Sequence, residues 1–193
     1  MSLRRLNPNF LFDGDDFYFK KFANSCTTYG EYGCGKSSKW IIRNTKVNII
    51  SIETDKKWAE KVLENISHND RMNLRYVDCG PVRKWGKPIN SSKKENYIEY
   101  CKSMWSKSSK PDFVLIDGRF RVCCFLISIK SAEEGTKIIF DDYINRSEYH
   151  VVENILKPSK IYGRQAIFTV PKFQTLDTDK INELINRSKY QIL

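Results

Sequence analysis

The sequence predicts an α/β fold, in which an open and mostly parallel sheet carries helices on both faces. Short apolar runs rich in β-branched and aromatic residues recur along the chain, and segments with helical spacing separate them. Strands separated by helices of this length form parallel sheets, which bind ligands at the carboxyl ends of their strands. The expected strands are Val47–Ile52, Leu74–Val77, Phe113–Ile116, Lys137–Phe140 and Ala166–Val170, after a first strand at about 25–29.

Four segments are expected to form helices beside this sheet. Residues 56–66 place Trp58, Ala59, Val62, Leu63 and Ile66 at helical spacing, with charged residues on the opposite face. Residues 120–132 form an apolar crossover helix that ends before Gly135. Shorter helices are expected at about 37–43, after a run of glycines, and at 179–187, where the helix completes the cover of the sheet.

Composition and length indicate one domain. The chain has 193 residues, of which 40% are apolar and 29% charged, which suits a single core. No apolar run approaches the roughly 20 residues that span a bilayer, and no secretion signal is recognisable, so we expect a cytoplasmic protein. We expect residues 1–193 to form one domain with a helical N-terminal extension at about 1–24.

The six cysteines indicate neither zinc nor a redox dithiol. They contain no CxxC pair and have no histidine at ligand spacing, so buried free thiols are expected. They stand at positions 26, 34, 79, 101, 123 and 124.

A basic insertion interrupts the alternation of strands and helices. Residues 79–110 carry eight Lys or Arg against two Glu, and this +6 is more than half of the net charge of +10. A connection of this length is typical of a lid or a binding insertion. Its cations and aromatic rings suit an acidic sugar, a phosphorylated acceptor or nucleic acid, although a solvated loop is the alternative.

The segment Gly30–Ser38 allows two interpretations. It reads GEYGCGKSS and connects an expected strand to an expected helix, where free amides and the helix dipole attract ligands. Gly30–Ser37 fits a phosphate-loop pattern, with Lys36 on nucleotide phosphates and Ser37 and Asp117 on magnesium. The alternative is a nucleoside-binding turn built on Glu31, Gly33 and Gly35.

Two acidic residues favour the nucleoside interpretation. Glu31 would repel a triphosphate but suits the ammonium and sulfonium groups of S-adenosylmethionine. Glu53 follows a strand 18 residues after Gly35, close to the roughly 20 at which an acid meets ribose hydroxyls. The alternative role for Glu53 and Asp55 is to cap the helix at 56–66.

A second constellation places acids after two neighbouring strands. Asp117 follows Phe113–Ile116, and Asp141 and Asp142 follow the next strand. Three such carboxylates could bind one magnesium ion, which prefers oxygen ligands. Capping of helices, or pairing with Arg119, Arg121 and Arg146, is the alternative.

In this order the motifs resemble those of class I S-adenosylmethionine-dependent methyltransferases, and in particular a bacterial branch of methyltransferase-like proteins. The resemblance covers about 24–171 and includes YGEYGCGKSS, VNIISIETDKKWAEKV, LRYVDCG, PDFVLIDGRFR and KIIFDDY. It implies a Rossmann-like, doubly wound sheet. It also implies that Glu31, Gly33 and Gly35 bind the methionine and ribose part of the donor, Glu53 the ribose hydroxyls, and Asp78 with Cys79 the adenine.

The three aspartates also resemble the metal site of catechol O-methyltransferase-like enzymes, in which Asn usually replaces the residue that is Asp142 here. The function expected from these observations is S-adenosylmethionine-dependent methyl transfer to a small hydroxylated or glycan-type acceptor. Asp117 is the expected base or metal ligand, and Mg²⁺ is a candidate cofactor. Nucleic acid is a less favoured acceptor. The alternatives are a non-catalytic Rossmann-like binding module and a phosphate-loop nucleotide-binding enzyme.

Overall fold

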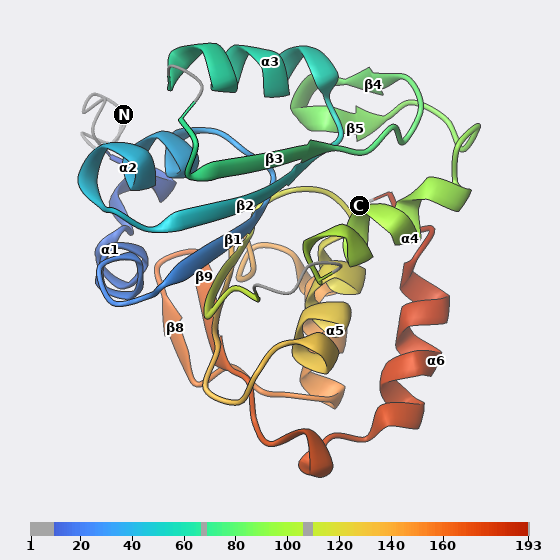
Figure 1. Ribbon diagram of the computed structural model, residues 1–193. Helices are drawn as coiled ribbons and strands as arrows, with labels where there is room; N and C mark the ends of the chain where they lie inside the picture. The colour runs from blue at the N-terminus through green and yellow to red at the C-terminus, as the bar shows by residue number, and fades with distance from the viewer. Residues whose placement is uncertain (1–9, 67–68, 106–109, 193) are drawn as a thin grey trace.

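The centre of the molecule is a seven-stranded sheet (Figure 1). The computed structural model describes residues 10–66, 69–105 and 110–192. Across the sheet the strands follow the order β3-β2-β1-β6-β7-β9-β8, and all neighbours are parallel except β9, which runs antiparallel to β7 and β8. The strands are β1 Thr28–Tyr32, β2 Asn48–Glu53, β3 Met72–Tyr76, β6 Phe113–Ile116, β7 Lys137–Phe140, β8 Lys160–Tyr162 and β9 Gln165–Thr169.

Helices cover both faces of this sheet, and the predicted doubly wound α/β architecture is confirmed. Successive residues of a strand point to opposite faces, so Phe113 and Leu115 belong to one core and Val114 and Ile116 to the other. The first core is closed by α1 Phe17–Ala23, α2 Lys36–Asn44 and α3 Lys56–Asn65, and the second by α4 Glu95–Lys102, α5 Arg121–Ser131 and α6 Thr178–Ser188.

Strands β2, β3 and β9 lie within two residues of their predicted bounds, whereas β1 is displaced further, and β4 (Val82–Arg83), β5 (Lys87–Pro88) and β8 were not predicted. Strand β1 begins three residues later than expected, because the carboxylate of Asp112 accepts hydrogen bonds from the amides of Thr27 and Thr28 and fixes that turn. Glu31 therefore lies inside the strand. Strand β8 has only three residues, and all three are at least partly exposed, so it leaves no apolar run in the sequence.

The N-terminal segment is an integral part of the first core. Phe19 of α1 is fully buried, and its ring contacts those of Phe12, Tyr29, Trp40 and Phe113 at centroid distances of 5.2 to 5.8 Å. Within the described range, the predicted N-terminal extension is thus a helix that packs on the sheet. Residues 1–9 lie outside that range.

The basic insertion divides into two structural parts. Its first part is a small hairpin, β4 Val82–Arg83 and β5 Lys87–Pro88. Its second part, α4, buries Tyr97, Tyr100 and Cys101, which share one helix face. Helix α4 is therefore the crossover between β3 and β6. The predicted lid is thereby restricted to the hairpin, for which it stays a prediction. Residues 106–109 lie outside the described part of the chain.

The cysteines are free, as expected, and five of the six are buried. Burial raises the pKa of Cys79 to about 12. None of the helices in the described ranges is long and apolar enough to cross a membrane.

The packing of Phe19 generates a stability prediction. We expect Phe19→Ala to destabilise the protein by about 3–5 kcal/mol, because it leaves a cavity among four aromatic rings. Phe17→Ala is the matched control, since Phe17 is 58% exposed. Equal loss in the two variants, measured by urea denaturation, would contradict a core role for α1.

Candidate functional site

The predicted site residues lie at one edge of the sheet. Strands β1, β2, β6 and β7 are parallel, so the residues that follow them meet at the same edge. The strand order reverses between β1 and β6, which is where open α/β sheets place their ligand crevice.

A turn that only glycine fits forms the centre of this edge. Gly33 has φ +89°, and a Cβ atom there would lie 2.9 Å from the Cα atom of Gly118. A Cβ atom on Gly118 would lie 2.8 Å from the amide nitrogen of Gly33. The turns after β1 and β6 therefore touch backbone to backbone. Gly35 meets no such constraint, since its nearest neighbour would be 3.9 Å away.

Glu31 is a fully buried carboxylate that four hydroxyl groups surround. It accepts hydrogen bonds from Ser37 at 2.7 Å, Ser51 at 2.9 Å and Tyr29 at 3.0 Å, and a short one from Ser38. Burial raises the pKa of Glu31, while these hydroxyl groups lower it and leave a net upward shift. The carboxylate thereby ties the start of α2 to β1 and β2.

The same arrangement counts against the phosphate-loop interpretation. That interpretation needs a loop that begins at Gly30, but Gly30 and Glu31 belong to strand β1. The hydroxyl of Ser37, the expected magnesium ligand, is buried and donates to Glu31. The backbone of this segment therefore forms a tight turn after Tyr32 rather than a phosphate cradle.

Glu53 is held beside the glycine turn. One of its oxygens accepts from the amide of Cys34 at 3.1 Å, and the other from the amides of Thr54 at 2.7 Å and Asp55 at 3.0 Å. Asp55 caps α3 by accepting from the amide of Trp58. The capping alternative thus applies to Asp55, whereas Glu53 orients the turn.

Trp58 of α3 and the hairpin at Gly86 both contact residues of this part of the site. The indole nitrogen of Trp58 donates to the carbonyl of Cys34 at 2.7 Å. The hairpin approaches from the other side, where Thr54 donates to the carbonyl of Gly86 at 2.8 Å. Gly86 has φ +64°, and a Cβ atom there would lie 3.1 Å from the carboxylate of Glu53. Sequence reasoning assigned Trp58 to the core and missed this contact.

Asp78 and Cys79 follow β3 at the same edge. Asp78 pairs with Lys93 and accepts from the amide of Gly80 at 3.0 Å, and these contacts lower its pKa. Cys79 is fully buried, so only its backbone could face a ligand.

Asp117, Asp141 and Asp142 lie together, as predicted, with one oxygen of each within 4.8 Å of the others. Two arginines neutralise them. Arg121 contacts Asp117 at 2.9 Å and Asp142 at 3.5 Å. Arg164 binds both oxygens of Asp141, at 2.6 and 3.0 Å.

Of the arginines proposed as partners from the sequence, Arg121 pairs with Asp117 and Asp142, whereas the pairing of Arg164 was not predicted. Arg164 follows the short strand β8, which no pattern revealed. It also binds Asp13 at 3.0 Å, so the N-terminal segment helps to hold it.

The residues of this trio do not fit Mg²⁺ as they are arranged. Magnesium needs carboxylate oxygens with free lone pairs. Asp141 uses both oxygens for Arg164, and Gln165 donates to one of them at 2.9 Å. A metal would have to displace Arg164, so the structure gives the predicted metal role no support.

Asp117 has an unusual acidity. Burial raises its pKa to about 7, the charges of Asp141 and Asp142 add to that effect, and Arg121 opposes it. Its side chain is still 35% exposed. A partly open carboxyl that titrates near neutral pH is suited to accept a proton.

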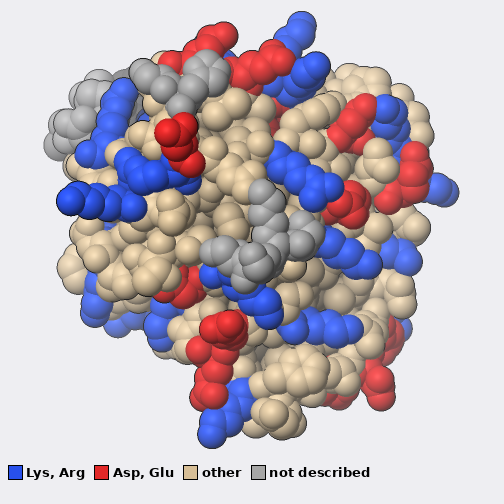
Figure 2. Space-filling model, in the orientation of Figure 1, with Lys and Arg blue, Asp and Glu red and all other residues tan. Residues whose placement is uncertain are grey.

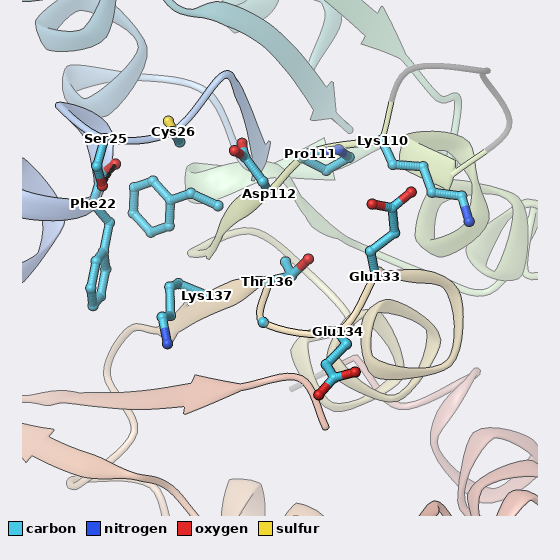
Figure 3. A pocket seen from close by; sticks show the side chains of 12 residues that line it. Phe22, Ser25, Cys26, Lys110, Pro111, Asp112, Glu133, Glu134, Thr136 and Lys137 are labelled. Atoms are coloured by element: carbon cyan, nitrogen blue, oxygen red, sulfur yellow. Dashed lines mark hydrogen bonds between the residues drawn. The ribbon is translucent and has the colours of Figure 1, made fainter. Parts of the chain in front are cut away.

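A cavity of about 310 Å³ lies at the opposite edge of the sheet, at the amino ends of β6 and β7 (Figure 3). Two of its charged residues are engaged in structural contacts: Asp112 binds the amides of Thr27 and Thr28, and Lys137 donates to Thr169. It contains none of the predicted site residues.

No family model and no curated protein sequence matches the chain. Among solved structures it is similar to a methyltransferase-like protein from Silicibacter pomeroyi DSS-3, with 28% identity, a TM-score of 0.81, and coverage of 92% of this chain and 94% of that one.

Two more distant structures contain S-adenosylhomocysteine. An RNA methyltransferase from Salinibacter ruber is 14% identical with a TM-score of 0.52, and covers 82% of this chain and 90% of its own. The N-methyltransferase NodS from Bradyrhizobium japonicum WM9 is 10% identical with a TM-score of 0.56, and covers 87% and 91%.

The chain has the class I methyltransferase fold and is similar to a methyltransferase-like protein over nearly its whole length. The family resemblance inferred from its motifs is thereby confirmed at the level of fold and protein class.

The hydroxyl shell of Glu31 generates a second prediction. We expect Glu31→Gln to lower the free energy of unfolding by about 1–3 kcal/mol, because the amide would leave buried hydroxyl donors unsatisfied. Glu64→Gln, on the exposed face of α3, is the control. Equal stability of both variants in denaturant titrations would contradict a structural role for Glu31.

Proposed function

We propose that this protein binds S-adenosylmethionine at the edge formed by Gly33, Gly35 and Glu53 and transfers its methyl group to a small hydroxylated or glycan-type acceptor in the cytoplasm. The observation that carries the proposal is the glycine turn on Glu53, located at the switch point of the sheet. The structures with bound S-adenosylhomocysteine support the choice of donor.

Each proposed donor contact follows from a position in the fold. Glu53 approaches the turn at the end of β2, where a carboxylate is able to accept hydrogen bonds from ribose hydroxyls. The missing Cβ atom of Gly33 lets the backbone of Gly118 pack against the turn, whereas the backbone of Gly35 is open to close approach, since a Cβ atom there would lie 3.9 Å from its nearest neighbour. Asp78 and the backbone of Cys79 remain the proposed adenine contacts. Glu31 holds the start of α2, which follows the turn, through its hydrogen bonds. We propose that Glu31 acts on the donor through the electrostatic field of its carboxylate.

The donor supplies an activated methyl group, so the protein mainly has to align the acceptor and remove its proton. We propose Asp117 as the residue that accepts this proton. Its neighbours Arg121 and Arg164 hold the acidic cluster in place without a metal.

On the face displayed in Figure 2, the distribution of charge favours a small acceptor over nucleic acid. Figure 2 shows Lys and Arg interspersed with Asp and Glu over the displayed face rather than gathered in a stripe. Nucleic-acid binding needs a continuous basic surface along the backbone of the ligand.

A non-catalytic binding module is the second candidate. The observation that favours it is the extensive pairing of Asp141, whose two oxygens are both engaged by Arg164. Donor binding without turnover of any hydroxylated acceptor would support this candidate.

The donor site generates a third prediction. We expect the wild type to bind S-adenosylhomocysteine with a dissociation constant in the micromolar range, and Glu53→Gln to bind it at least about tenfold more weakly, since a hydrogen bond to a charged group contributes about 1.5–3 kcal/mol. Isothermal titration calorimetry measures both values.

Glu60→Gln, an exposed α3 variant, should bind like the wild type. Circular dichroism of Glu53→Gln checks that its fold is kept. Absence of S-adenosylhomocysteine binding to the wild type would overturn the proposed function, and so would unchanged binding by a folded Glu53→Gln.

The acidity of Asp117 generates a fourth prediction. Its pKa is about 7 in the folded protein and about 3.9 in an unfolded chain, so the folded state binds the extra proton between these values. Stability contributed by Asp117 is therefore present at low pH and lost as the pH rises toward 7. We expect the thermal stability of Asp117→Asn relative to the wild type to rise between about pH 4 and pH 7 and to stay level above pH 7.

Asp70→Asn is the control, because Asp70 is exposed. A stability difference between Asp117→Asn and the wild type that stays constant with pH would contradict the raised pKa.

A further inference from the structure

We propose that the acceptor carries a phosphate or carboxylate group, which binds to Arg83, Lys87, Arg119 and Arg146 beside Asp117. We refer to these four residues as the cation cluster. This inference rests on the proposed methyl transfer and narrows its substrate class from hydroxylated molecules in general to anionic ones.

The hairpin supplies two members of the cation cluster. Arg83 and Lys87 are directly opposite each other in the β4–β5 pair. Like charges in this position destabilise a hairpin, so its folding gains nothing from them. In the described ranges no acidic side chain forms an ion pair with either residue. Their charges are thus left for a ligand.

The other two members are arranged around Arg121. Arg119 and Arg121 both donate through Nε to the carbonyl of Gly118, at 3.1 and 3.0 Å. Arg121 and Arg146 both lie over the ring of Tyr149, at 5.9 and 5.7 Å from its centroid. Arg121 thus shares one carbonyl with Arg119 and one ring with Arg146, and Arg146 also lies 4.0 Å from the carboxylate of Glu148.

The two halves of the cation cluster adjoin the same glycine turn, because Gly86 contacts Glu53, Glu53 binds the amide of Cys34, and Gly118 contacts Gly33. The acidity of Lys87 agrees with this placement. Partial burial lowers the pKa of Lys87, and the charges of Arg83, Arg119 and Arg146 lower it further. Arg119 is likewise half-buried, and burial followed by the charge of Arg121 lowers its pKa. Cations crowded in this way gain stability when an anion binds among them.

Two members of the cation cluster directly follow glycines that contact the proposed donor site. On the hairpin, Lys87 follows Gly86, whose backbone rests on Glu53 and Thr54. On the sheet edge, Arg119 follows Gly118, which touches Gly33 and comes directly after Asp117. An anionic group bound here would keep the rest of its molecule close to both the proposed donor turn and the proposed base. Four cations confined to a turn and a hairpin suit a compact anion rather than a long polyanion.

The test uses the full chain saturated with S-adenosylhomocysteine and three probes: inorganic phosphate, glucuronate and glucose. Calorimetry or ligand-observed NMR measures their affinities. We expect at least one anion to bind at least tenfold more tightly than glucose.

We expect the double variant Arg83→Gln/Lys87→Gln to bind that anion at least tenfold more weakly than the wild type. Lys172→Gln/Lys180→Gln, which removes the same charge at exposed positions far along the chain, should keep it. Preference for phosphate over glucuronate would identify a phosphorylated acceptor, and the reverse a carboxylated one.

Three results would overturn the inference. Equal affinity for the anions and for glucose would exclude a specific anion site. Equal losses in the two double variants would reduce the effect to net charge. Anion binding that S-adenosylhomocysteine abolishes would assign the cation cluster to the carboxylate of the donor. S-adenosylhomocysteine binding is measured separately, so its absence identifies failure of the proposed function, whereas its presence without anion binding refutes this inference alone.

Discussion

The arrangement of the proposed donor site depends on one buried carboxylate. Glu31 cannot be solvated by water, and four hydroxyl groups replace that solvation. Because two of these groups belong to α2 and one to β2, the carboxylate fixes where α2 begins relative to both strands. The position of α2 determines the path of the turn at Gly33. This path places the amide of Cys34 where it donates a hydrogen bond to Glu53. The sequence placed Glu31 in contact with the donor. Glu31 is thus also the anchor of the backbone that would contact the donor.

The acidic edge of the sheet is organised by a complementary principle. Three carboxylates within 4.8 Å of one another would repel, and two guanidinium groups compensate them. Their compensation is uneven: Asp141 is saturated by Arg164, whereas Asp117 keeps an open side. The difference leaves one carboxyl near neutrality at physiological pH, without any need for an ion to assemble the group. The uneven pairing therefore distinguishes Asp141, whose oxygens are engaged in structural contacts, from Asp117, the proposed base.

The sequence was sufficient to predict the strands of the sheet other than β8. Buried parallel strands produce apolar runs that can be recognised without knowing which strand pairs with which. The sequence was also sufficient to bring Glu53, Asp117 and Asp141 to one edge, since parallel strands align their carboxyl ends. It was insufficient for Arg164, because the neighbouring β8 is too short and too exposed to leave a pattern. It placed α4 in a loop-like insertion, because the lysines around that helix obscured the face formed by Tyr97, Tyr100 and Cys101. Side-chain contacts such as that of Trp58 with Cys34 depend on tertiary geometry, which periodicity does not encode.

The contact of Arg164 with Asp13 joins residues 151 positions apart. During synthesis the N-terminal segment and the strand ends that bear Asp117 and Asp141 leave the ribosome before Arg164 does. Until β9 pairs with β7, the aspartates at this edge lack their second guanidinium, and mutual repulsion opposes their approach. Closure of the long loop carries an entropic cost that the ion pairs repay only at the end. The charge balance of this edge is therefore completed late in folding, and a nascent chain truncated before β8 would have only Arg121 to compensate its three aspartates.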